Sequence, residues 1–135
     1  MESILTNSLR RADRFWLLDG AMGTMLQAQG LTEEDFRRHH FTSFRKDLKG
    51  NNDVLCMTCP EAVLKVHNAY LEAGADIIET NTFNSNAVSQ EEYGLQDLVY
   101  ELNKAGASVA RKAADAYTRL NPGKPRFVAG SMGPT

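Results

Sequence analysis

Residues 67–86 read HNAYLEAGADIIETNTFNSN, and this stretch contains the end of a helix, a strand and a polar loop. Apolar residues recur at helical spacing as far as Tyr70, and Gly74 suits the left-handed residue that often ends a helix. Residues 75–80, which follow directly, predict a strand. The stretch therefore predicts a helix–strand unit of an α/β protein.

The same alternation continues on both sides of this unit. Residues 15–18 form a short apolar run without alternation, which predicts a strand covered on both faces, and residues 21–29 predict a helix. An apolar stripe from Leu95 to Tyr117 predicts the longest helix, and residues 126–130 predict another strand. Because parallel strands need a long connection, we expect about three parallel strands with crossover helices.

Other parts of the sequence predict a long loop, the start of a helix and open edges of the sheet. Residues 31–57 are polar and aromatic without a clear period, which predicts a long loop. Thr58 and Glu61 have the spacing of a capping box, so we expect the next helix to begin there. A sheet of this kind leaves both outer strands with unpaired edges. We therefore expect residues 1–135 to be a partial domain that ends after its third strand, with self-association through the open edges as an alternative.

The composition narrows the class of protein. Apolar residues make up 42% of the chain and charged residues 24%, and the formal net charge of −2 comes without a basic stripe. We therefore expect a globular protein that does not bind nucleic acid. No run approaches the roughly 18 apolar residues that span a bilayer, so we expect no membrane partner. The 2 cysteines are too few for a disulfide framework, which favours a cytoplasmic location.

The loops after parallel strands gather at one end of the sheet, which makes that end the candidate site. Residues 19–24, 81–85 and 131–135 are such loops, and their small, hydroxyl and amide side chains suit a small polar ligand. Asp19 directly follows the first strand, where a carboxylate can pair with a ligand ammonium group at low dielectric. The alternative is that Asp19 caps the helix that follows. Glu79, at the end of the next strand, either binds a cation or pairs with a lysine or arginine.

Cys56 and Cys59 have the spacing of half a zinc site or of a redox dithiol. Zinc would need further ligands, for which His39, His40 and His67 are candidates. Cys59 falls in the first turn of a predicted helix and His67 on its apolar face. We therefore favour packing or ordinary exposure over ligation for these side chains.

Taken together, several blocks of the sequence resemble the N-terminal homocysteine-binding domain of cobalamin-dependent methionine synthases. The blocks are LLDGAMGTMLQ at 17–27, KGNNDVL at 49–55, HNAYLEAGADIIETNTFNSN at 67–86 and VAGSMGPT at 128–135. The Asp-Gly-x-Met-Gly-Thr motif alone indicates the wider homocysteine methyltransferase family. The Lys-Gly-Asn-Asn-Asp and Glu-Thr-Asn-Thr-Phe-Asn-Ser motifs favour the cobalamin enzyme.

The resemblance implies that this chain is the N-terminal portion of a (β/α)8 TIM barrel that binds homocysteine at the C-terminal ends of its strands. In that family a zinc ion lowers the pKa of the homocysteine thiol, and the thiolate attacks the methyl group of methylcobalamin to give methionine. The substrate-binding residues that the resemblance implies are Asp19, Gly20, Ala21, Thr82, Phe83 and Ser131. Asp19 would take the substrate ammonium group, and backbone N–H groups of Gly20 and Ala21 would take its carboxylate.

The family's zinc-binding cysteines lie late in the barrel, and Cys56 and Cys59 do not correspond to them. We therefore expect no zinc or cobalamin bound to this chain and no methyl transfer by the chain alone. The partners that the resemblance implies are the remaining half of the barrel and the folate, cobalamin and reactivation domains. The alternatives are a standalone binding or assembly module and a homocysteine methyltransferase that uses betaine or methylmethionine as its methyl donor.

Overall fold

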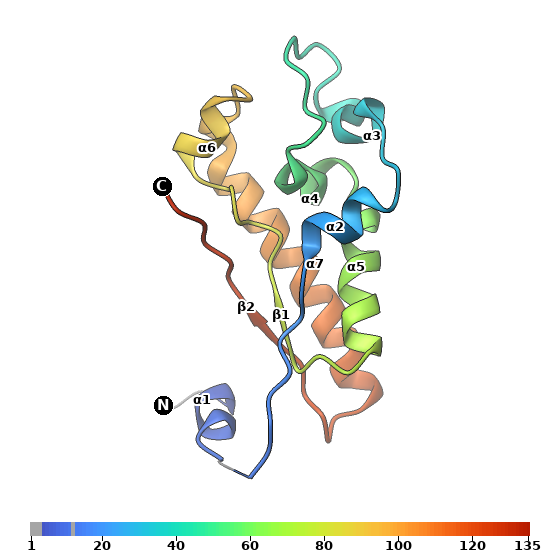
Figure 1. Cartoon of the computed structure of the whole chain (residues 1–135), viewed down its shortest axis with the longest axis vertical. Helices are drawn as coiled ribbons and strands as arrows, with labels where there is room; N and C mark the ends of the chain where they lie inside the picture. Colours follow the sequence, from blue (N-terminus) through green and yellow to red (C-terminus); the bar gives the residue numbers. More distant parts are fainter. Residues whose placement is uncertain (1–3, 12) are drawn as a thin grey trace.

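The computed structural model describes residues 4–11 and 13–135, in which helices alternate with short strands (Figure 1). The α-helices are α1 (Ile4–Leu9), α2 (Met22–Gln27), α3 (Glu33–Arg37), α4 (Leu55–Thr58), α5 (Pro60–Glu72), α6 (Ala87–Glu91) and α7 (Val99–Leu120). The 3-10 helices are η1 (Arg38–His40), η2 (Asn52–Val54) and η3 (Gln96–Leu98), and the strands are β1 (Ile77–Glu79) and β2 (Phe127–Ala129). No helix within these ranges combines the length and apolar character needed to cross a membrane.

The sheet is parallel, as the sequence predicts. Strand β1 pairs with β2 in a register that places Ile77 beside Phe127, and Leu18 adds a parallel bridge to Ile77. The first predicted strand is therefore reduced to one bridge. The reason is that the N–H group of Leu17 donates to the side chain of Asp76 at 3.0 Å instead of to a backbone carbonyl. The expected class, α/β with parallel strands and crossover helices, is confirmed.

The helices cover one face of this sheet. Helix α7 packs against both strands, and α5 packs against α7 and β1 (Figure 1). Ile78 points into this layer and is completely buried, beside Ala110 and Ala113 of α7. By contrast, Phe15 is 94% exposed and Leu18 is 54% exposed. The prediction that residues 15–18 are covered on both faces is therefore wrong, because the helices that pack against the sheet, α5 and α7, cover one of its faces.

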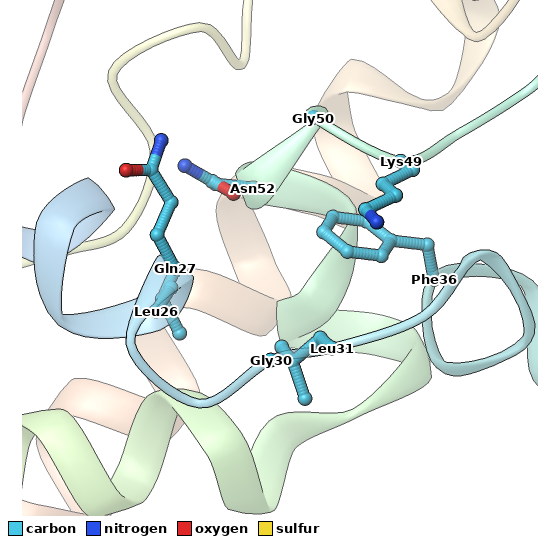
Figure 2. Close-up of a pocket in the computed structure, with 8 residues that line it drawn as sticks. All are labelled: Leu26, Gln27, Gly30, Leu31, Phe36, Lys49, Gly50 and Asn52. Atoms are coloured by element: carbon cyan, nitrogen blue, oxygen red, sulfur yellow. The ribbon is translucent and has the colours of Figure 1, made fainter.

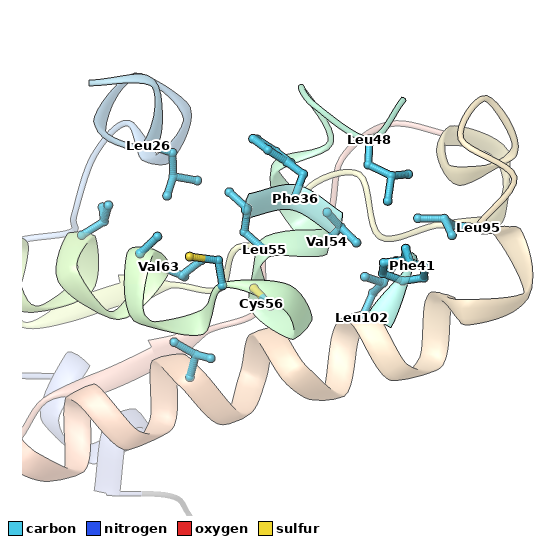
Figure 3. Packing of buried hydrophobic residues seen from close by; sticks show 14 residues of the cluster. Leu26, Phe36, Phe41, Leu48, Val54, Leu55, Cys56, Val63, Leu95 and Leu102 are labelled. Carbon is cyan, nitrogen blue, oxygen red and sulfur yellow. The ribbon is translucent and has the colours of Figure 1, made fainter. Parts of the chain in front are cut away.

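The larger hydrophobic cluster lies beyond the sheet, between α2, α4, α5 and α7 (Figure 3). The segment 31–57 supplies much of it, through residues that include Phe36, Phe41, Leu48 and Leu55. The prediction of a long loop here is wrong, because the segment contains α3, η1, η2 and α4. These helices have five residues or fewer, so no helical period is visible in the sequence.

The longer helices begin and end only partly at the residues that the sequence predicts. Gly74 follows α5 with φ +109°, as expected for a residue that ends a helix. The predicted capping box of Thr58 is wrong, because Thr58 belongs to α4 and its hydroxyl donates to the carbonyl of Val54 at 3.3 Å. Helix α7 begins at Val99, after a 3-10 turn, and not at Leu95.

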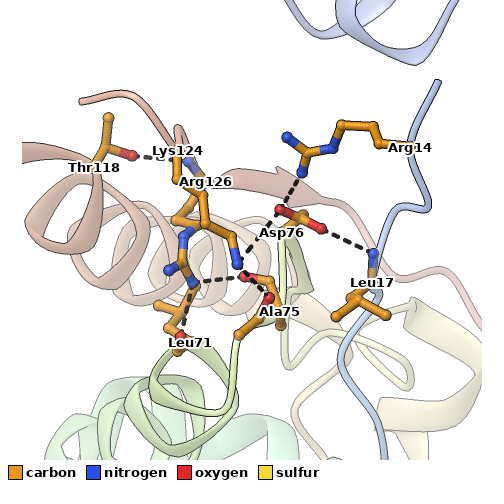
Figure 4. Close-up of polar contacts among 9 residues, drawn as sticks. Arg14, Leu17, Leu71, Ala75, Asp76, Thr118, Lys124 and Arg126 are labelled. Atoms are coloured by element: carbon orange, nitrogen blue, oxygen red, sulfur yellow. Dashed lines mark hydrogen bonds and ion pairs between the residues drawn. The ribbon is translucent and has the colours of Figure 1, made fainter. Parts of the chain in front are cut away.

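The amino ends of the strand segments are joined by Asp76, whose side chain is buried (Figure 4). Its carboxylate accepts hydrogen bonds from Arg14 Nη2 at 2.6 Å and from the N–H group of Leu17 at 3.0 Å. Its backbone N–H donates to the carbonyl of Leu17 at 2.8 Å, and its own carbonyl accepts from the N–H group of Phe127 at 2.9 Å. One residue therefore holds three strand segments in register.

Replacing Asp76 with alanine should lower the free energy of unfolding by about 3 kcal/mol, because two hydrogen bonds to a carboxylate are lost. The Asp76→Asn variant keeps an acceptor for Leu17 and should lose less. Urea unfolding of the two variants and of the exposed control Asp47→Asn measures the difference. Equal stability of the alanine variant and the wild type would contradict the proposed joining role.

His67 adds a pH-dependent contribution to stability. It lies on α5 with no exposed surface, and neither ring nitrogen has a hydrogen-bond partner among the described residues. Burial lowers the pKa of His67 to about 4. Below its ordinary pKa of 6.5 the unfolded chain therefore binds a proton that the folded chain excludes, and the folded state loses stability as the pH falls toward 4.

The His67→Leu variant removes this contribution. Its free energy of unfolding, relative to that of the wild type, should rise by about 3 kcal/mol between pH 7 and pH 4. Burial also raises the pKa values of Asp19 and Asp53, so the difference between the two proteins is the quantity to compare. Urea titrations at several pH values measure it, and a difference that stays constant with pH would show that folding does not change the pKa of His67.

Candidate functional site

The loops after the strand segments surround a polar cavity of about 420 Å³ at the carboxyl end of the sheet. This is the end at which the sequence places the site. The predicted residues that line the cavity are Asp19, Gly20, Ala21, Phe83 and Ser131. Residues far apart in the sequence are therefore brought together around one small volume, as expected for loops that follow parallel strands.

Asp19 has one paired and one unpaired carboxylate oxygen. Oδ2 accepts a hydrogen bond from the N–H group of Glu79 at 3.0 Å. Oδ1 is buried and has no hydrogen-bond partner within the described ranges. Burial, together with the nearby negative charge of Glu79, raises the pKa of Asp19 to about 6. Asp19 is thus a carboxylate with a free acceptor beside a cavity.

The structure argues against one of the two interpretations of Asp19, the capping of the helix that follows. The N-cap of α2 is Ala21, which has no side-chain capping bond, so Asp19 does not cap this helix. The turn at Gly20 and Ala21 instead rests on Tyr70 of α5, whose hydroxyl donates to the carbonyl of Ala21 at 3.0 Å. A Cβ at Gly20 would lie 3.2 Å from the same hydroxyl oxygen, so a side chain there would crowd Tyr70.

Thr82 lies behind the cavity wall. Its side chain is buried, and its hydroxyl donates to the carbonyl of Ser131 at 2.8 Å. Thr82 Oγ1 is also 2.6 Å from the hydroxyl oxygen of Thr80, which accepts from the N–H group of Ser131 at 3.0 Å. The two threonines therefore fix the backbone of Ser131, whereas Phe83 lines the cavity and is 53% exposed.

The predicted loop 81–85 also contributes Asn81 and Asn84 to the cavity wall. Asn52 and Asp53 of η2 line the cavity as well, although the sequence does not place them in the site. They fall in the segment 31–57, which has no helical or strand period to indicate which surface it will meet. Asp53 is 2% exposed, and burial raises its pKa.

Glu79 also lines the cavity. Its side chain is exposed, and it forms no ion pair with any residue that the structure describes. Pairing with a lysine or arginine, one of the two predicted alternatives, is therefore not observed. Three carboxylates, those of Asp19, Asp53 and Glu79, border the same volume. A cationic group is the ligand charge that this arrangement favours.

The cysteines are buried and free, as the packing interpretation predicts. The Cys56 thiol donates to the carbonyl of Asn81 at 3.5 Å, and burial raises its pKa to about 12. Cys59 Sγ lies 3.1 Å from the guanidinium group of Arg38. No cluster of three or more His, Cys, Asp or Glu side chains in the described part of the chain could hold a metal ion.

A second cavity of about 290 Å³ lies between α2, α3 and the turn before η2 (Figure 2). Leu26, Leu31 and Phe36 form its apolar side, and Asn52 belongs to the walls of both cavities. No carboxylate lines this second cavity, so the candidate chemistry lies in the first.

Gly106 of α7 lies against the loop that follows β1. From the sequence, a glycine inside a helix predicts only a slight weakening of that helix, by about 1 kcal/mol. In the structure a Cβ at this position would lie 2.4 Å from Thr82 Cγ2. Thr82 cannot move away freely, because its hydroxyl is bonded to Ser131. The missing side chain at Gly106 therefore allows α7 to approach the loop after β1.

Comparisons with known proteins show similarity over nearly all of this chain. The family model for homocysteine S-methyltransferases matches residues 16–135 of this chain. The metallated form of the homocysteine methyltransferase MmuM from Escherichia coli is similar over 96% of this chain, with 30% identity and a TM-score of 0.73. The oxidized form of the same protein is similar over 98% of this chain, with 30% identity and a TM-score of 0.74. This chain spans 41% of the length of either structure.

Replacing Gly106 with alanine should destabilise the protein by about 1–3 kcal/mol, because the new Cβ overpacks the contact with Thr82. Helix propensity alone predicts the opposite sign, a gain of about 1 kcal/mol. Thermal and urea unfolding decide between them. The reverse change at the exposed neighbour, Ala107→Gly, is the control and should cost about 1 kcal/mol. A stabilised Gly106→Ala variant would show that α7 does not lie this close to the loop.

Proposed function

This chain belongs to the homocysteine S-methyltransferase family, and on that premise we propose that its polar cavity binds the amino-acid end of homocysteine. In this proposal the Asp19 carboxylate pairs with the substrate ammonium group. The backbone N–H groups of Gly20 and Ala21 donate to the substrate carboxylate, and Phe83 and Ser131 form part of the surrounding wall. Thr82 contributes by holding Ser131 in place.

The observation that carries the proposal is the unpaired Oδ1 of Asp19. A buried polar atom without a partner costs free energy, and a bound ammonium group would supply the missing donor. The carboxylates of Asp53 and Glu79 border the same cavity and favour that cationic end of the ligand. Neither Gly20 nor Ala21 donates a backbone hydrogen bond to any described residue, so both N–H groups are available to a carboxylate.

The reaction that we propose for the whole enzyme is transfer of a methyl group to the homocysteine sulfur, which gives methionine. The residues of this chain bind and orient the substrate. A zinc ion, when bound, would lower the pKa of the substrate thiol. The described residues do not fit that ion, because Cys56 is a buried thiol whose pKa is raised to about 12 and Cys59 packs against Arg38. We therefore assign this chain no step that runs through the metal.

We propose a cobalamin-dependent methionine synthase as the enzyme class, in the cytoplasm, with the rest of the barrel and the folate, cobalamin and reactivation domains as partners. The support for this finer assignment is the sequence of residues 49–53 and 79–85. The similarity to the Escherichia coli homocysteine methyltransferase supports homocysteine as the methyl acceptor. The assay offers homocysteine and one methyl donor at a time to the protein that carries this sequence. The donors are methylcobalamin, betaine and methylmethionine, and the one that yields methionine is the methyl donor of the enzyme.

Replacing Asp19 with asparagine should weaken homocysteine binding by about tenfold to a hundredfold at pH 7.5, because a charged hydrogen bond to the ammonium group is lost. Wild-type affinity should also fall as the pH drops below about 6, since Asp19 then becomes protonated. The variant should lack that pH dependence. Calorimetry from pH 5 to pH 8 tests both expectations, with Asp47→Asn as the exposed control. Equal affinities of the Asp19→Asn variant and the wild type would exclude the proposed role of Asp19.

A further inference from the structure

The turn at residues 51–53 is bonded to the cavity loop, which we define as residues 81–85. Asn81 Nδ2 donates to the carbonyl of Asn52 at 2.8 Å. Asp53 Oδ2 accepts from the N–H group of Asn84 at 2.9 Å and from the hydroxyl of Ser85 at 2.7 Å. These bonds join segments about thirty residues apart, and Asp53 supplies two of them through a single oxygen.

Asn84 is held on both of its backbone polar groups. Its N–H group donates to Asp53, and its carbonyl accepts from Gln90 Nε2 at 3.0 Å. Gln90 in turn exchanges two amide hydrogen bonds with Asn51, at 2.7 and 3.2 Å, and both side chains are buried. The backbone of Asn84, a residue that lines the cavity, is therefore fixed by the turn from two directions.

The charge of Asp53 is not explained by stability alone. Its side chain is 2% exposed, and no lysine, arginine or histidine of the described ranges forms an ion pair with it. A buried carboxylate without a counterion costs free energy. Hydrogen bonds to an ionised acceptor are shorter and stronger than those to a neutral one. A carboxylate at this position thus gives tighter control of the loop than an amide would.

We propose that Asp53 is a positioning residue, which holds the cavity loop in the conformation that forms the ligand-binding wall. Its carboxylate acts through Asn84 and Ser85 and does not itself contact the reacting atoms. This inference rests on the proposed function for the identity of the ligand, and on the hydrogen bonds above for the geometry. It assigns a role to the Lys-Gly-Asn-Asn-Asp motif at residues 49–53.

The experiment compares Asp53→Asn, Ser85→Ala and the exposed control Asp47→Asn with the wild type. Amide hydrogen exchange followed by NMR reports the opening of the loop at Asn84, calorimetry reports homocysteine affinity, and thermal unfolding reports global stability. Asp53→Asn keeps an oxygen acceptor, so it should fold. It should speed exchange at Asn84 and weaken homocysteine binding, each by about tenfold. Ser85→Ala removes one donor only and should produce a smaller change in the same direction.

Unchanged exchange at Asn84 in the Asp53→Asn variant would overturn the proposal. So would a loss of affinity that merely follows a loss of global stability while Asn84 stays protected, because that result would indicate a general structural role. If Asp53→Asn fails to fold, the exchange of Asn84 in Ser85→Ala decides the matter in the same way. If the wild type does not bind homocysteine but Asn84 opens in Asp53→Asn, the proposed ligand is wrong and the control of the loop by Asp53 stands.

Discussion

Asp76 accepts the N–H group of Leu17 on its side chain, while its backbone bonds to both Leu17 and Phe127. The strand segments are short, so few ladder hydrogen bonds are available to set their register. A shift of one residue would turn every side chain of a strand to the other face of the sheet. With the register fixed at the amino ends, Asp19 and Ser131 reach the opposite end of the sheet together, and the cavity forms there.

The polar cavity contrasts with the well-packed clusters around it. Asp19 keeps an unpaired buried oxygen, and Asp53 is a buried carboxylate without a counterion in the described part of the chain. Such groups lower stability, and proteins retain them mainly where a ligand or a reaction uses them. His67 is also buried and has no hydrogen-bond partner among the described residues, but it lies on α5 within the helical layer and does not line the cavity. Unpaired burial alone therefore does not identify the site, and the shared cavity is what groups Asp19 with Asp53.

Much of this arrangement follows from the sequence, because strands and long helices have local patterns. The order of the elements and the end of the sheet that carries the loops follow from apolar runs such as 15–18, and Asp19 is visible as a polar residue that ends this run. The contribution of residues 51–53 to the cavity cannot be predicted from the sequence, because it depends on contacts with a loop about thirty residues later in the chain. The exposure of Phe15 could not be predicted either, since an apolar run does not indicate which of its faces the helices will cover.

The close approach at Gly106 limits the rotation of α7 around its own axis. Successive residues of an α-helix are rotated by about 100° around its axis. Gly106 is the only glycine of α7, and a Cβ at the contact with Thr82 would collide with that side chain. The helix therefore has one allowed rotational setting, and the same setting turns Ala110 and Ala113 toward the sheet. The absence of a side chain at Gly106 thus fixes how the helical layer is oriented relative to the polar cavity.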